Sequence, residues 1–161
     1  MHSSASTPPT PEDFGILLGL AYQRFVEELN QHLHKCGFAD LGSSFGYVLR
    51  AVASDPVTAT ELAARLRLTP QGAAKIVDDM VKGGYVERRP DPHDARARRL
   101  VLARRGRRAL AEARAFHADF ERRLEDTLGK RGAAELRRAL ESLVAGTEGG
   151  ADTSSRVLRP L

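Results

Sequence analysis

Apolar residues recur every three or four positions over several stretches of the chain, the spacing that places them on one face of a helix. Residues 12–35 show this pattern on more than one side, so we expect a helix there with more than one buried face. Residues 42–53 follow the same period. The period returns from about 104, with one break marked by Gly129 and Gly132, and so predicts a long helix and a final shorter one.

Two helix starts in the middle of the chain carry specific capping signals. Thr58 and Glu61 have the spacing of a capping box, in which each side chain accepts a hydrogen bond from the other residue's backbone N–H. Thr69 is suited to cap the next helix, and Pro70 to its first turn, where a missing N–H costs nothing. This helix should end near Gly83. The pattern therefore predicts two short helices joined by a tight turn.

The apolar period changes after the second of these helices. Residues 85–89 and 98–102 predict two short strands, and the turn-rich segment 90–94 joins them into a hairpin. A helix pair followed by a hairpin, between helical ends, describes a winged helix-turn-helix. The fold class predicted is mainly α with a small β-hairpin wing. The expected parts are a disordered arm (1–11), a helical dimerisation region (12–40 and 104–146), a DNA-binding lobe (41–103) and a flexible tail (147–161).

Positive charge is concentrated in one segment of this arrangement. The 161 residues include 25 Lys and Arg against 21 Asp and Glu, a formal charge of +4. Ten of the basic residues and three of the acidic ones lie in 82–108, so this segment carries +7 and the remainder −3. Such asymmetry favours a polyanionic partner, because neutralising phosphates supplies affinity that does not depend on sequence. On charge alone a solvated charged face is an equal alternative. The charge together with the helix pair and the hairpin predicts double-stranded DNA as the partner.

The composition argues against several other classes of protein. The single cysteine, Cys36, cannot form an internal disulfide, so a reducing cytoplasm is expected. No signal peptide is expected, since residues 1–11 have neither a cationic start nor an apolar core. No membrane span is expected, since about 18 uninterrupted apolar residues occur nowhere. His32, His34 and Cys36 form the one candidate metal cluster, but residues two apart on a helix point to different sides. We therefore expect no metal and no cofactor.

Candidate catalytic residues are limited to two isolated pairs, His93 with Asp94 and His117 with Asp119. Neither pair comes with a nucleophile motif or a glycine-rich phosphate loop. We therefore expect no enzyme.

The second helix of a helix-turn-helix lies in the DNA major groove, with its first residues at the base edges. Its exposed face should carry Gln71, Ala74, Lys75 and Asp78. Gln71 can pair with adenine, Ala74 can contact a thymine methyl group, and Lys75 can reach guanine or phosphate.

The hairpin adds a second predicted contact with DNA. Arg96 near its tip can enter a narrow minor groove, with Asp94 orienting it and with Arg98 and Arg99 near the DNA backbone. The predicted DNA-binding residues are Thr58, Thr69, Pro70, Gln71, Ala74, Lys75, Asp94, Arg96, Arg98 and Arg99.

Three short motifs lie within this region: E-L-A in the first short helix, G-Y-V-E-R at the first strand and D-P-x-D-x-R in the hairpin. Together they resemble the MarR family of bacterial transcriptional regulators, over about Val57 to Arg108. The resemblance implies a homodimer with interlocking terminal helices and two lobes on a pseudo-palindrome. It also implies, in many members, a small-molecule or redox signal that releases DNA.

The chain departs from the family pattern at three places. Gly72, Ala73 and Ala74 stand where hydroxyl residues are common, which leaves fewer direct hydrogen bonds to bases. Arg67 stands where a glycine is common in the turn. Ala103 replaces a common threonine before the long helix, which weakens that cap by about 1 kcal/mol.

Self-association is expected independently, because the terminal helices carry more apolar surface than one small lobe can cover. An effector pocket, if one is present, should lie between the first, second and fifth helices, near Tyr22, Phe45, Tyr47 and Arg50. The alternative for these residues is that they are core aromatics and one charge on a helix face. The sequence thus predicts a dimeric, cytoplasmic transcriptional regulator, with repression favoured. An architectural DNA-binding protein without an effector is the alternative, and a small metalloenzyme is a remote third.

Overall fold

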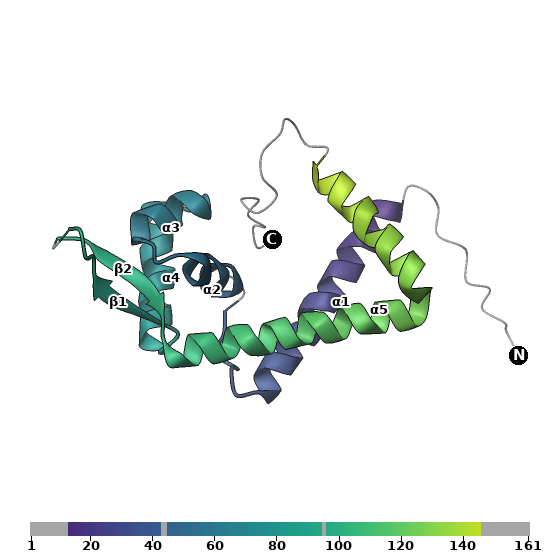
Figure 1. Cartoon of the computed structure of the whole chain (residues 1–161), viewed down its shortest axis with the longest axis horizontal. Coiled ribbons are helices and arrows are strands. Elements are labelled where there is room, and N and C mark those ends of the chain that lie inside the picture. Colours follow the sequence, from purple (N-terminus) through teal and green to yellow (C-terminus); the bar gives the residue numbers. More distant parts are fainter. Residues whose placement is uncertain (1–12, 43–44, 95, 146–161) are drawn as a thin grey trace, which may run out of the picture. The chain divides into compact units, whose positions relative to one another are not determined.

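The computed structural model describes residues 13–42, 45–94 and 96–145 (Figure 1). The predicted arm and tail lie outside these residues. Contacts divide the chain into two compact units, of which the first ends at Ala39 and the second begins at Asp40. The first unit contains α1 (Phe14–Lys35). The second contains α2 (Phe45–Ser54), α3 (Ala59–Arg65), α4 (Pro70–Lys82), β1 (Val86–Pro90), β2 (Arg98–Leu102) and α5 (Arg104–Ala145).

The second unit is a winged helix-turn-helix, so the predicted fold class is confirmed. Helices α3 and α4 pack against each other, the hairpin packs against α2 and α4, and α2 also contacts α5 (Figure 1). The strands pair antiparallel, from Val86 opposite Leu102 to Pro90 opposite Arg98. None of the helices in the described part of the chain combines the length and apolar character that a membrane span requires.

Both predicted helix caps are present. The Thr58 hydroxyl oxygen accepts a hydrogen bond from the backbone N–H of Glu61 at 3.2 Å, and the Glu61 carboxylate accepts one from the backbone N–H of Thr58 at 2.8 Å. The Thr69 hydroxyl oxygen accepts one from the backbone N–H of Gly72 at 3.1 Å, and Pro70 opens α4 as expected. These local bonds fix where α3 and α4 begin.

Some element boundaries differ from those predicted. Helix α2 begins at Phe45 and not near 42. Strand β1 begins at Val86 and not at 85, because the backbone N–H of Tyr85 still donates to the carbonyl of Met80, at 2.8 Å, and so closes the turn after α4.

One isolated bridge attaches the hairpin to the start of α3. The backbone N–H of Leu100 donates to the carbonyl of Val57 at 2.7 Å. Both side chains are buried in the core of the lobe. Helices α2, α3, α4 and α5 and both strands contribute buried side chains to this core. Its largest fully buried side chains are Val48, Leu49, Val57, Leu62, Val77, Met80, Tyr85, Val86 and Leu100.

Helix α5 belongs to the same unit as the lobe. It contacts α2 and β2. The grouping of residues 12–40 with 104–146 as a dimerisation region stays a prediction. The predicted break at Gly129 is present as a kink inside α5, with φ 73° and ψ 158°, a conformation that glycine adopts readily. Gly132, which marked the same predicted break, lies in the helical segment that follows this kink.

Gly106 allows α5 to dock on the lobe. A Cβ atom at this position would lie 2.0 Å from the backbone carbonyl oxygen of Tyr85, so no side chain fits there. The same carbonyl accepts a hydrogen bond from the backbone N–H of Ala103 at 3.0 Å, just before the helix. The first turn of α5 therefore lies directly on the backbone that enters β1.

Replacing Gly106 with Ala is expected to lower the free energy of unfolding by about 1–3 kcal/mol, because the helix must shift away from the Tyr85 carbonyl. Gly46→Ala is the matched control, since a Cβ there meets no atom within 4 Å. It should be neutral or slightly stabilising, because alanine favours a helix. Urea denaturation at one fixed protein concentration compares the two, and equal effects would contradict the docking role of Gly106.

Candidate nucleic-acid interface

Helix α4 presents the predicted polar face to solvent. Ala73, Val77 and Met80 are buried against the lobe. On the opposite side, the residues expected at the DNA are exposed together with the start of the helix. The exposed residues are Thr69, Pro70, Gln71, Ala74, Lys75 and Asp78. The amphipathic pattern of the sequence therefore places these side chains correctly on one surface.

An ion pair between α4 and β1 was not foreseen. Arg88 Nη2 lies 2.5 Å from Asp78 Oδ1, and both side chains are partly exposed. The pair balances a carboxylate that would otherwise repel phosphates from the exposed face of α4. The sequence would have predicted this ion pair only if the polar face of α4 had been expected to lie beside the first strand of the hairpin.

The tip of the wing is shaped by Asp94. Its Oδ1 accepts a hydrogen bond from the backbone N–H of Arg96 at 2.9 Å, and its carbonyl accepts one from the backbone N–H of Ala97 at 3.0 Å. The sequence suggested that Asp94 orients the guanidinium of Arg96. The bond instead goes to the backbone of Arg96, because an Asp two residues upstream in a turn readily caps that N–H. The side chain of Arg96 is exposed.

Arg98 and Arg99 occupy different environments although they are neighbours. Arg98 is exposed, whereas Arg99 is partly buried and bonded within the lobe. Arg99 Nε donates to Asp91 Oδ2, and Arg99 Nη1 donates to the carbonyl of Pro56 at 2.7 Å. A backbone N–H bond from His93, followed by the Arg99 contact, lowers the pKa of Asp91, which keeps this carboxyl ionised.

A shallow groove of about 590 Å³ lies between the wing and the start of α3. Its lining is strongly charged and includes Glu61, Arg65, Arg89 and Arg99. None of the residues predicted for the effector pocket lines it.

The predicted effector-pocket residues on α2 have partners inside the second unit. The ring of Phe45 packs edge-on against Tyr85, with centroids 5.9 Å apart. Arg50 Nη2 lies 2.9 Å from His117 Nε2 on α5. A guanidinium only donates, so His117 accepts there in its neutral form, and burial followed by the charge of Arg50 lowers its pKa. Tyr22 belongs to the first unit, Tyr47 is half-buried on α2, and the pocket stays a prediction.

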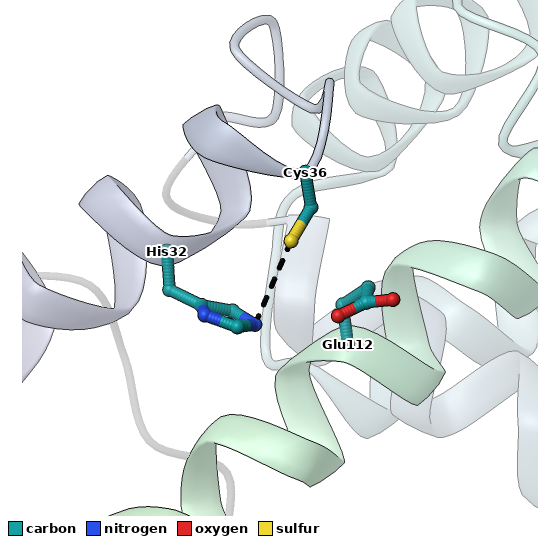
Figure 2. Close-up of side chains that lie close together, drawn as sticks. All are labelled: His32, Cys36 and Glu112. Atoms are coloured by element: carbon teal, nitrogen blue, oxygen red, sulfur yellow. Dashed lines mark hydrogen bonds between the residues drawn. The ribbon is translucent and has the colours of Figure 1, made fainter.

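The end of α1 carries the cysteine of the candidate metal cluster. Cys36 Sγ lies 3.7 Å from His32 Nε2, one helical turn away (Figure 2). His34, which lies between these two residues in the sequence, is exposed. Glu112, which the same view labels, lies on α5 of the second unit.

The turn between α3 and α4 contains a strained residue. Arg67 has φ +48°, the left-handed region in which a Cβ is unfavourable. The departure noted in the sequence, an arginine where glycine is common, therefore falls on a position whose backbone favours glycine. Its side chain is exposed, so the strain is local to the turn.

Arg67→Gly is expected to raise the free energy of unfolding by about 0.5–1 kcal/mol. The relief of about 1–2 kcal/mol of left-handed strain is partly offset by the greater entropy of glycine in the unfolded chain. Thermal unfolding at fixed protein concentration measures the change. Arg67→Ala keeps the Cβ in the same conformation and should give no gain. A gain of similar size in both variants would rule out backbone strain as the cause.

One comparison with known proteins matches this same part of the chain, the helix-turn-helix and the wing. A family model described as the MarR family matches residues 46–97, from α2 to the wing. The exopolysaccharide II synthesis transcriptional activator ExpG of Rhizobium meliloti is 28% identical over 104 residues. This alignment covers 65% of the chain and 54% of ExpG, so the chain spans about half the length of this curated relative.

Solved structures share the fold over most of the chain. The reduced form of MarR from E. coli is 22% identical, with a TM-score of 0.65, and the match covers 87% of this chain and 99% of that one. A mutant MarR from E. coli complexed with operator DNA is 23% identical, with a TM-score of 0.62, over 81% and 92% of the two chains.

These comparisons agree with the prediction that the chain is not an enzyme, since the family and the curated relative are transcriptional regulators. The motifs of the wing and the helix pair lie inside the matched segment. The segment from α2 to the wing is thus similar to the MarR family, and the chain shares the fold of solved MarR structures.

Proposed function

We propose that this chain is a homodimeric, sequence-specific DNA-binding regulator that represses transcription in the cytoplasm from a pseudo-palindromic operator. The observation that carries the proposal is the joint exposure of two surfaces on one lobe, the polar face of α4 and Arg96 on the wing. A structural neighbour with this fold was solved with operator DNA, which supports the proposal.

In this proposal α4 enters the major groove with its N-terminal end foremost. Gln71 pairs with adenine, Ala74 contacts a thymine methyl group, and Lys75 reaches guanine or phosphate. The hydroxyl oxygens of Thr58 and Thr69 accept capping bonds, and their O–H groups can donate to phosphates. Pro70 brings the backbone at the start of α4 close to the DNA strand whose phosphates these threonines contact.

The wing supplies the second contact. Arg96 enters the minor groove, where a narrow groove concentrates negative potential, and Arg98 lies along the DNA backbone. Asp94 contributes by holding the backbone of Arg96 in its turn. With few hydroxyl groups at the start of α4, much of the sequence preference then comes from DNA shape.

Exposed apolar side chains support the homodimer. Among the residues that the structure describes, eleven large hydrophobic ones are exposed, all of them in α1 or in the second half of α5. A soluble chain rarely leaves so many apolar groups in water, and a second copy would cover them. The residues are Phe14, Ile16, Leu17, Leu18, Leu20, Tyr22, Leu128, Leu136, Leu140, Leu143 and Val144.

Selection of bound duplexes from a random DNA pool should yield a pseudo-palindrome with half-sites about one helical turn apart. Arg96→Ala and Lys75→Ala should each weaken operator binding by about 1–3 kcal/mol. Arg114→Ala, at an exposed position in the first third of α5, is the control and should bind like the wild type. Equal binding to the selected site and to random DNA of the same composition would favour the architectural alternative.

The homodimer has its own test in analytical ultracentrifugation at micromolar concentration, where a mass of twice the 17.6 kDa chain is expected. Leu140→Glu should shift the protein towards monomer, because a charge cannot be buried unpaired in an apolar interface. Ala111→Glu places the same charge at another exposed position of α5 and should remain dimeric. A monomeric wild type would contradict the proposal.

A further inference from the structure

Asp91 is the one charged side chain that is buried in the described part of the chain, and the wing is built around it. Its side chain is only 5% exposed. Oδ1 accepts a hydrogen bond from the backbone N–H of His93 at 2.8 Å, which shapes the wing tip. Oδ2 accepts one from Arg99 Nε. Burying a carboxylate is costly unless both its charge and its lone pairs are satisfied, so Asp91 depends on Arg99.

Arg99 also reaches outside the hairpin. Its Nη1 donates to the carbonyl of Pro56 at 2.7 Å, in the loop that leads to α3. The next residue in each segment forms the bridge already described, in which Leu100 N–H donates to the Val57 carbonyl. One guanidinium therefore joins the wing tip, the second strand and the start of the helix-turn-helix.

The neighbouring arginine provides a contrast. Successive side chains of a strand point to opposite faces, so Arg98 and Arg99 cannot both face the same partner. Arg98 is exposed, whereas the charge of Arg99 is matched by Asp91 and two of its nitrogen atoms already donate within the lobe. Of these two arginines, Arg98 is the one suited to contact a phosphate.

We propose that Arg99 is a positioning residue that fixes the wing relative to α4, so that Arg96 and α4 engage one DNA site together. This role replaces the phosphate contact expected from the sequence, and it rests on the proposed DNA-binding function. Arg99 acts on DNA only through the placement of Arg96. A planar guanidinium is required, because the single ammonium group of lysine cannot span Asp91 and the Pro56 carbonyl in the same way.

The salt dependence of operator binding distinguishes a positioning residue from a phosphate contact. Arg99→Gln should weaken binding about tenfold and should reduce the slope of log affinity against log salt no more than Arg96→Ala does, because Arg99 acts only through Arg96. Arg98→Gln should instead reduce the slope by about one, as expected for the loss of one phosphate contact. Arg99→Lys should behave like Arg99→Gln. Rescue by lysine, or a slope in Arg99→Gln that falls further than in Arg96→Ala, would overturn the proposal.

A double-mutant cycle tests whether Arg99 acts through Arg96. In an Arg96→Ala background, Arg99→Gln should weaken binding by less than twofold, because the wing contact it positions is already gone. Full additivity of the two substitutions would contradict the proposal. The cycle is informative even if Arg99→Gln lowers global stability, because that effect would appear equally in both backgrounds.

Hydrogen exchange in the absence of DNA provides a measurement that does not depend on the proposed function. The Leu100 amide, which closes the bridge to Val57, should exchange about tenfold faster in Arg99→Gln than in the wild type, while α5 amides near Leu110 should not change. Unchanged exchange at Leu100 would overturn the holding role. If the wild type bound no DNA, the proposed function would fail, and the exchange result would still decide whether Arg99 holds the wing.

Discussion

The second unit is organised around the close approach of Gly106 in α5 to the backbone carbonyl of Tyr85. That carbonyl lies at the junction of α4 and the wing, so the contact sets where the long helix leaves the lobe. Arg105 strengthens the junction by donating to the carbonyl of Gly83 at 2.7 Å and by lying over the Tyr85 ring, 4.5 Å from its centroid. The recognition helix, the wing and α5 therefore share one point of attachment.

A small polar cluster extends this junction to the beginning of the second unit. The hydroxyl of Tyr85 donates to Asp40 at 2.6 Å, and Arg105 pairs with the same carboxylate at 2.7 Å. The Tyr85 bond is the main cause of the lowered pKa of Asp40, and burial with the Asp40 bond raises the pKa of Tyr85 to about 12. Near neutral pH the tyrosine is thus a neutral donor and the aspartate a charged acceptor. Their hydrogen bond keeps the beginning of the second unit attached to the rest of the lobe.

The parts of this lobe that the sequence predicted well are those determined by near neighbours in the chain. The caps at Thr58 and Thr69 and the apolar face of α4 follow from residues within one or two helical turns, so the capping and periodicity rules apply directly. The role of Arg99 could not be predicted in this way, because its partner Pro56 lies 43 positions away. Strand alternation was the available signal, since it allows only one of the adjacent arginines Arg98 and Arg99 to face DNA.

The same reasoning changes the meaning of the cationic segment 82–108. Its net charge of +7 is a sum along the sequence, but Arg88 and Arg105 pair with acids outside the segment, and Arg99 pairs with an acid inside it. The acids that make the rest of the chain negative are thus partly the counter-charges of this segment. Some of its arginines hold α4, the wing and α5 together, and exposed ones such as Arg96 are those proposed to contact DNA. Charge counted along the chain indicated the class of partner, whereas packing determines which charges that partner would meet.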